Sequence, residues 1–83
     1  MFYVYVLKSA KDDRLYIGYT NNLKRRFTEH TQGMNKSTKH RLPLSLIYYE
    51  AYKSQADAEA REQRLKSSSG AYVALKRRIG DCL

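Results

Sequence analysis

The sequence is poor in several residue types, and each shortage excludes a class of protein. Cys82 is the only cysteine, so the chain cannot form an internal disulfide, and nothing indicates an oxidising compartment. No apolar run reaches the ~18 residues typical of a membrane helix. The N-terminal segment also lacks the basic start and the small-residue cleavage site of a signal peptide. We therefore expect a cytoplasmic protein with no membrane partner.

Acidic residues are scarce as well. The chain has 8 Asp or Glu against 16 Lys or Arg, so its 83 residues carry a net charge of +8. The charge is uneven, because six Lys or Arg and two His lie between Lys24 and Arg41 with a single acid, Glu29, and residues 76–78 form a second basic group. Such a surplus favours a polyanionic partner, and we favour a nucleic acid over a basic surface that is merely solvated.

The residues that are present predict a small α/β (α+β) fold. Runs of β-branched and aromatic residues predict strands, and helical spacing with capping residues predicts helices. In chain order we expect strands at 2–7 and 15–19, a helix from 23, a strand at 44–52, and helices at 55–66 and about 70–80. The order β-β-α-β-α-α predicts a three-stranded, mainly antiparallel sheet flanked by helices. We expect one domain over residues 1–83, with its core at about 2–66.

The first predicted helix has an apolar face and a start signal. Leu23, Phe27 and Met34 recur at helical spacing and share one face. Thr20 and Asn21 are good N-cap residues just before it. These residues therefore mark the start of the expected helix, whose apolar face is directed to the core.

Two basic residues of this helix lie close to its apolar face. With about 100° per residue, Arg26 and His30 fall on the flank of the face that carries Leu23 and Phe27, whereas Arg25 points away. Arg26 and His30 are four residues apart, so their side chains can meet. Because an unpaired buried charge is costly, the place of Arg26 indicates that it meets an anion.

Tyrosines of the first two strands form a second candidate cluster. Side chains alternate along a strand, so Tyr3, Tyr5 and Leu7 share one face of the sheet. The hairpin can bring Tyr5 and Tyr16 side by side on one surface. Tyrosines in strands are more often packing residues than catalytic ones, so this cluster alone does not identify a site.

Together these residues form a pattern that resembles the GIY-YIG nuclease family. The pattern runs from Tyr3-Val4-Tyr5 to Tyr16-Ile17-Gly18, then to Arg26 and His30, and ends at Glu62 in the segment AREQRLK. The second motif is present literally, whereas the first has Tyr3 where the family name has glycine. The resemblance covers residues 2 to about 66 and is closest to small stand-alone members.

The resemblance implies a metal-dependent endonuclease that hydrolyses DNA phosphodiester bonds, with a role in repair or processing; RNA is not excluded. Glu62 would hold one divalent ion, Mg²⁺ or Mn²⁺, which needs few protein ligands. Arg26 would bind the scissile phosphate. Tyr5 or Tyr16 would orient or deprotonate the attacking water, and His30 would hydrogen-bond a tyrosine or relay its proton.

Each of these roles has a structural alternative. Glu62 and Lys66 form an ordinary i, i+4 helix pair, Arg26 could pair with Glu29 or Glu62, and His30 could be a satisfied core histidine. Two histidines and the remote Cys82 do not make a closed zinc site.

Six further basic residues are expected to contact the nucleic-acid backbone. They are Lys24, Arg25, Lys36, Lys39, His40 and Arg41. Two other functions stay open: a non-catalytic nucleic-acid-binding module with the same fold, and a protein-interaction domain that seeks an acidic partner. The oligomeric state, monomer or homodimer, is not fixed by the sequence.

Overall fold

The computed structural model describes residues 1–83, the side chain of Cys82 excepted. Its elements are β1 (Phe2–Ser9), β2 (Leu15–Thr20), α1 (Leu23–Thr31), η1 (Lys39–Arg41), β3 (Leu44–Tyr52), α2 (Gln55–Ser67), α3 (Ser69–Arg78) and η2 (Gly80–Cys82). This order confirms the predicted fold class, and the two short 3-10 turns are the only additions. No helix of the described chain is long and apolar enough to cross a bilayer.

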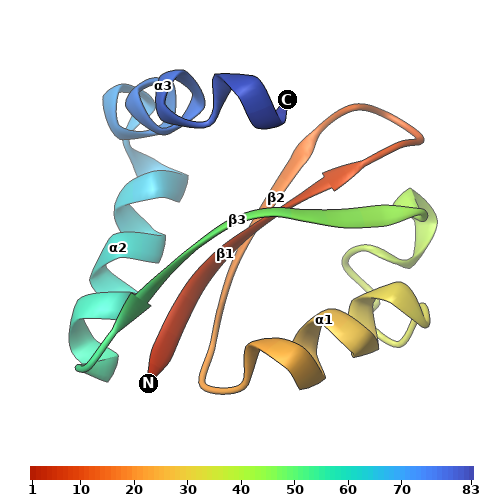
Figure 1. The fold of residues 1–83 in the computed structure, drawn as a ribbon, viewed down its shortest axis with the longest axis horizontal. Helices are drawn as coiled ribbons and strands as arrows, with labels where there is room; N and C mark the ends of the chain where they lie inside the picture. Colours follow the sequence, from red (N-terminus) through yellow and green to blue (C-terminus); the bar gives the residue numbers. More distant parts are fainter.

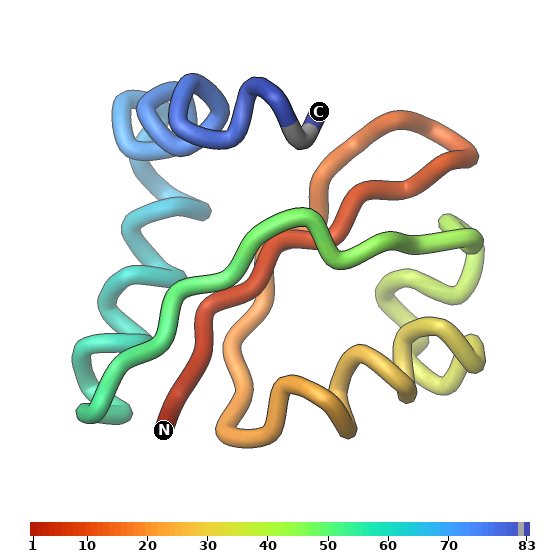
Figure 2. Tube along the Cα trace, in the orientation of Figure 1, coloured from red at the N-terminus to blue at the C-terminus, as the bar shows by residue number. Residues whose placement is uncertain are grey.

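The three strands form one antiparallel sheet in the order β2-β1-β3, so β1 is central and β2 is an edge strand. Helix α1 lies against one face of the sheet, and α2 with α3 lies against the other (Figure 1). In Figure 2 the chain after α1 turns back beside the end of this helix before it enters β3. The sheet thus separates two layers of side chains.

Strand alternation in β1 divides the core between the two layers. Val4 and Val6 face α2 and α3 and pack in a cluster with Leu65 and Leu75. The odd-numbered residues of β1, such as Tyr5, point to the other side of the sheet, where they face α1 and pack with Leu23 and Phe27. The alternation predicted for the tyrosines is therefore confirmed, and Tyr5 is directed to the layer that contains α1.

A β-bulge interrupts the pairing of β1 with β3. Val6 pairs with Tyr48 and Leu7 pairs with Leu46, so Ile47 is an extra residue in β3. Residues 46 and 49 are three apart and would lie on opposite faces of a regular strand. The bulge restores both of them to the face that carries α1.

The predicted N-cap of α1 and the predicted place of Met34 need correction. The N-cap is Asn22, whose side chain accepts a hydrogen bond from the backbone of Arg25 at 3.1 Å, rather than Thr20 or Asn21. Thr20 ends β2, and its hydroxyl hydrogen-bonds the backbone of Asn22, which moves the helix start by one or two residues. Met34 lies beyond the helix and is 66% exposed, so it does not belong to the apolar face. The reason is Gly33, whose positive φ of 73° ends the helical path.

Gly18 makes room for the ring of Tyr5, its partner in the β1–β2 ladder. A Cβ atom at Gly18 would lie 2.3 Å from the Tyr5 hydroxyl oxygen, which is closer than any real contact. The tyrosine ring therefore crosses over the edge strand at the one position without a side chain. Glycine at position 18 is therefore required by the packing of this ring.

We predict that Gly18→Ala lowers the free energy of unfolding by about 1–3 kcal/mol, because the Tyr5 ring must move out of its packed position. Urea unfolding monitored by circular dichroism measures this. Gly70→Ala is the matched control: its Cβ would meet only Ser68 Oγ at 3.9 Å, and alanine favours the helix by up to about 1 kcal/mol. Equal stability of Gly18→Ala and wild type would contradict the packing described here.

Candidate active site

A buried chain of hydrogen bonds lies between the sheet and α1. The Tyr5 hydroxyl is 2.9 Å from His30 Nε2, and His30 Nδ1 is 2.7 Å from Thr38 Oγ1. Tyr5 is 2% exposed, and His30 and Thr38 are fully buried. The chain joins β1, the last turn of α1 and the loop that precedes η1.

Burial controls the protonation of Tyr5 and His30 in this hydrogen-bond network. It raises the pKa of Tyr5, and the neighbouring Tyr16 raises it further. Burial also lowers the pKa of His30, and the charge of Arg26 acts in the same direction. Both groups are therefore neutral near pH 7. A neutral imidazole carries one proton, so His30 donates one of its two hydrogen bonds and accepts the other.

Thr38 is the one member of the Tyr5–His30–Thr38 hydrogen-bond network that the sequence did not predict. It lies in the basic loop, eight residues after His30, and no periodicity or motif in that loop points to it. Its contact depends on the return of the loop against the end of α1, which local sequence patterns do not reveal. A serine or threonine near a buried histidine is a common partner only once the fold is known.

Tyr16 lies beside this chain and is half-buried. Its ring centroid is 5.2 Å from that of His30 and 6.3 Å from that of Tyr5. Tyr16 also lines a cavity of about 480 Å³ between β2 and the junction of α2 with α3, together with Lys66 and Tyr72. The structure thus brings Tyr5 and Tyr16 together as predicted, and of the two only Tyr16 contributes to the lining of this cavity.

Arg26 is the inward member of the arginine pair, as the helical spacing predicts. Its side chain is 36% exposed against 58% for Arg25. Arg26 Nη1 lies 3.5 Å from Glu29 Oε1, which is the structural pairing expected as an alternative. Arg26 Nε, however, is buried and has no hydrogen-bond partner in the described part of the chain. A buried charged donor without a partner is costly, so this atom is prepared for an acceptor from outside the chain.

Glu62 approaches the same region from α2, on the other layer. Burial is the main reason that the pKa of Tyr5 is raised; the charge of Glu62 adds to this increase and the charge of Arg26 opposes it. Burial and the charge of Glu59 raise the pKa of Tyr19 on β2, and Glu62 adds to them. The Glu62 side chain is 16% exposed, and its Oε2 accepts a hydrogen bond from Lys66 at 3.2 Å. The i, i+4 pair is therefore present, and it occupies one of the two carboxylate oxygens.

One carboxylate of this site, that of Glu62, is a candidate ligand for an ion that needs few protein ligands. No group of three or more His, Cys, Asp or Glu able to bind a metal occurs among the described residues. A single carboxylate, Glu62, suits Mg²⁺, which keeps several waters and takes its remaining ligands from substrate phosphate. The expectation that Cys82 joins no metal site concerns a side chain outside the described residues.

The residues expected to contact nucleic acid divide into two groups. Five are exposed, namely Lys24, Arg25, Lys36, Lys39 and His40. Arg41 is different, because its side chain is only 21% exposed and its Nε donates to Asp12 Oδ2 at 3.1 Å. Its Nη2 also donates to the Leu15 carbonyl oxygen at 3.4 Å. The charge of Arg41 is therefore matched within the chain and holds the η1 turn to the β1–β2 hairpin.

Comparison with known proteins defines the class. The family model described as the GIY-YIG catalytic domain matches residues 1–78, so the chain belongs to the GIY-YIG family. This agrees with the resemblance found from the tyrosine motifs, Arg26, His30 and Glu62.

The relatives within this family are small proteins named UPF0213. The UPF0213 protein CPE1444 of Clostridium perfringens is 43% identical over 67 residues, covering 80% of this chain and 71% of its own. The UPF0213 protein SpyM50708 of Streptococcus pyogenes is 42% identical over 78 residues, covering 87% of this chain and 84% of its own. The solution NMR structure of the UPF0213 protein BH0048 from Bacillus halodurans superposes with a TM-score of 0.60 at 32% identity, covering 96% of this chain and 88% of that one.

We predict that the His30 imidazole stays neutral below the ordinary histidine pKa of about 6.5. Because its folded pKa is lowered, the unfolded chain binds more protons near that pH. The stability that His30 contributes is thus present above about 6.5 and is lost as the pH falls towards the folded pKa. An NMR titration of the ring nitrogens measures the midpoint directly, with the urea-unfolded protein as reference. A folded midpoint at or above the unfolded one would contradict the burial described here.

Proposed function

We propose that the protein is a metal-dependent endonuclease that hydrolyses phosphodiester bonds in DNA. The observation that carries the proposal is the buried, unpartnered Arg26 Nε beside the Tyr5–His30–Thr38 chain. Membership of the GIY-YIG family, whose matched model is a catalytic domain, supports a nuclease-type function. The net charge of +8 supports a polyanionic substrate.

Arg26 is proposed to bind the scissile phosphate. Its Nε can donate to a phosphate oxygen and so satisfy the donor that the folded chain leaves unpaired. The guanidinium remains charged through the reaction and stabilises the negative charge that builds on the phosphate in the transition state. Glu29, 3.5 Å away, restrains the arginine in this place without satisfying Nε.

The two tyrosines are proposed to have different roles. Tyr5 is buried, its hydroxyl is bound to His30 and its pKa is raised, so it is poorly suited to accept a proton from water. Tyr16 is half-buried, lies against His30 and lines a cavity, so it can reach the attacking water. We therefore propose Tyr16 as the residue that orients or deprotonates the water, with Tyr5 and His30 holding its ring in position.

Glu62 is proposed to bind the divalent ion, Mg²⁺ or Mn²⁺. No partner for its Oε1 is found among the described residues, so this oxygen is available as a ligand while Oε2 accepts from Lys66. When bound, such an ion neutralises charge on the phosphate and on the leaving oxygen.

A binding module that does not cut DNA is the second candidate. The Glu62–Lys66 pair favours it, because the carboxylate already has a cation partner at 3.2 Å. The two candidates share the fold, the basic surface and the salt dependence of binding. Metal-dependent cleavage separates them.

We predict metal-dependent cleavage of single-stranded, flapped or branched DNA at low salt that is abolished by a chelator and by Glu62→Gln. Arg26→Ala is expected to lower kcat by about 10²–10³-fold, the usual effect of losing one transition-state donor. Gel assays with Mg²⁺ or Mn²⁺ measure both effects.

Matched variants make the test specific. Glu59→Gln removes a carboxylate from the exposed side of the same helix and should retain cleavage. Arg25→Ala removes the outward arginine and should weaken binding without the loss in kcat. Binding of every substrate without cutting by wild type would favour the binding module, and equal cleavage by Arg26→Ala would contradict the phosphate role.

Binding should also depend on salt through the exposed cations only. We predict that Lys39→Gln lowers the slope of log K against log salt by about 1, because one phosphate contact is lost. Arg41→Gln, two residues away, should leave the slope unchanged and instead lower stability, because Arg41 pairs with Asp12. Fluorescence anisotropy between about 50 and 200 mM salt measures the slope. A larger effect of Arg41 than of Lys39 would overturn this assignment.

A further inference from the structure

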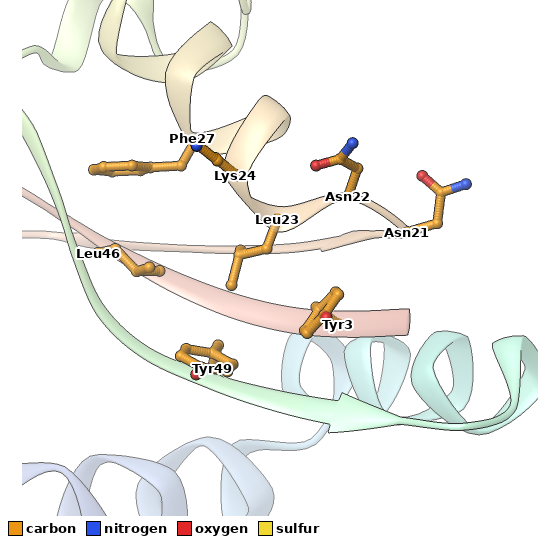
Figure 3. Close-up of a pocket in the computed structure, with 8 residues that line it drawn as sticks. All are labelled: Tyr3, Asn21, Asn22, Leu23, Lys24, Phe27, Leu46 and Tyr49. Carbon is orange, nitrogen blue, oxygen red and sulfur yellow. The ribbon is translucent and has the colours of Figure 1, made fainter. Parts of the chain in front are cut away.

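A second cavity lies on the flank of α1 that faces away from Arg26. Its volume is about 450 Å³, which is within the range of small-ligand pockets. Figure 3 shows Phe27 and Lys24 on one side of it, Tyr3 and Tyr49 on the other, and Leu46 at the left of the view. None of the residues assigned to phosphodiester chemistry lines this cavity.

The walls of the cavity are aromatic and partly open to solvent. The rings of Tyr3 and Tyr49 meet edge to face, with centroids 6.1 Å apart and an interplanar angle of 67°. Tyr49 is 53% exposed, which is high for a large apolar ring on a sheet. The ring of Tyr49 is held from one side by Tyr3 while much of its surface remains available for contact.

The backbone is arranged to build this wall. Tyr3 lies on the same face of β1 as Tyr5, and the bulge at Ile47 places Leu46 and Tyr49 on that face together. Tyr3 occupies the place of the glycine in the family name. With glycine at this position the cavity would lose one of its two tyrosine walls.

The rim of the cavity is polar, and two of its side chains are available to bind a ligand. Lys24 makes no ion pair, and the Asn21 side chain makes no hydrogen bond, within the described part of the chain. An amide can both donate and accept, as the edge of a nucleobase requires, and an ammonium can bind a phosphate. Flat aromatic walls, an amide and a cation together match a nucleotide better than an aliphatic ligand.

We propose that this cavity, the Tyr3–Tyr49 pocket, binds an unpaired nucleobase of the substrate strand, stacked on Tyr49, with a neighbouring phosphate on Lys24. The proposal rests on the proposed function and narrows its substrate class. A base within a duplex is stacked and paired and would have to flip out to enter, whereas a base in a single strand, flap or bulge enters freely. DNA with unpaired bases close to the cut site is therefore the expected substrate.

The test is a comparison of two 15-nucleotide single-stranded DNA probes, measured by anisotropy at low salt with EDTA so that no cleavage occurs. One probe has all its bases, and the other has the same backbone with an abasic site at every position. We expect wild type to bind the complete probe about 5- to 150-fold more tightly, the range that stacking of one base gives. Tyr49→Ala should bind both probes equally, and Tyr49→Phe should keep the preference.

Variants that remove a positive charge distinguish contacts to a phosphate from contacts to a base. Lys24→Gln should weaken both probes by the same factor, because phosphate contacts do not distinguish bases. Lys11→Gln removes an exposed lysine from the turn at the opposite end of β1 and is the matched control. Because Tyr49 is largely exposed, its variants are expected to fold, and circular dichroism checks this.

The outcomes show separately whether the pocket proposal fails and whether the proposed nucleic-acid function fails. Equal binding of both probes by wild type, or an unchanged preference in Tyr49→Ala, would overturn the pocket and leave the nuclease proposal standing. Binding of neither probe even at low salt would overturn the nucleic-acid function itself. Should Tyr49→Ala not fold, NMR of wild type with a trinucleotide decides. The ring signals of Tyr3, Tyr49 and Phe27 must shift, while those of Tyr48, which faces the opposite layer and donates to Glu50, must not.

Discussion

The hydrogen-bonded chain from Tyr5 through His30 to Thr38 is the interaction on which the rest of the site depends. It joins the central strand to α1 and to the following loop, and all three side chains are buried. None of them can exchange its partner for bulk water, so the loss of one leaves the others unsatisfied. These hydrogen bonds thereby fix the rotation of α1. Arg26, one turn before His30, is held on the inward flank, where its Nε has no acceptor among the described residues.

A second network fixes the other half of the site from the opposite layer. Arg61 donates two hydrogen bonds to Glu50, at 2.9 and 3.0 Å, and the hydroxyls of Tyr48 and Tyr52 donate to the same carboxylate. Burial raises the pKa of Glu50, but these hydrogen bonds outweigh it and the net shift is downward. Such partly buried ion pairs specify geometry more than they stabilise. Because Glu62 follows Arg61 in α2, the network also determines where Glu62 lies.

Local periodicity was sufficient for the features that one element determines alone. The inward place of Arg26 follows from helical spacing, and the shared face of Tyr3 and Tyr5 follows from strand alternation. Thr38 was not predictable, because its contact forms only when the loop returns to α1. The bulge at Ile47 was equally hidden, since the extra residue is defined by its pairing with β1 and not by its own sequence. The error at Met34 arose from extending a period across the glycine that ends the helix.

Under the proposed function, the two flanks of α1 have different roles: chemistry on one and selection of the substrate on the other. One flank carries Arg26 and His30 next to the edge strand, and the other carries Lys24 and borders the Tyr3–Tyr49 pocket. A strand that crosses the start of α1 would then be held by its phosphate on one flank and by a base on the other. Neither contact depends on which base is present, because every base has a face that stacks. On this proposal the arrangement selects unpaired structure, and Tyr3, which stands where the family name has glycine, supplies one of the two tyrosine walls of the pocket.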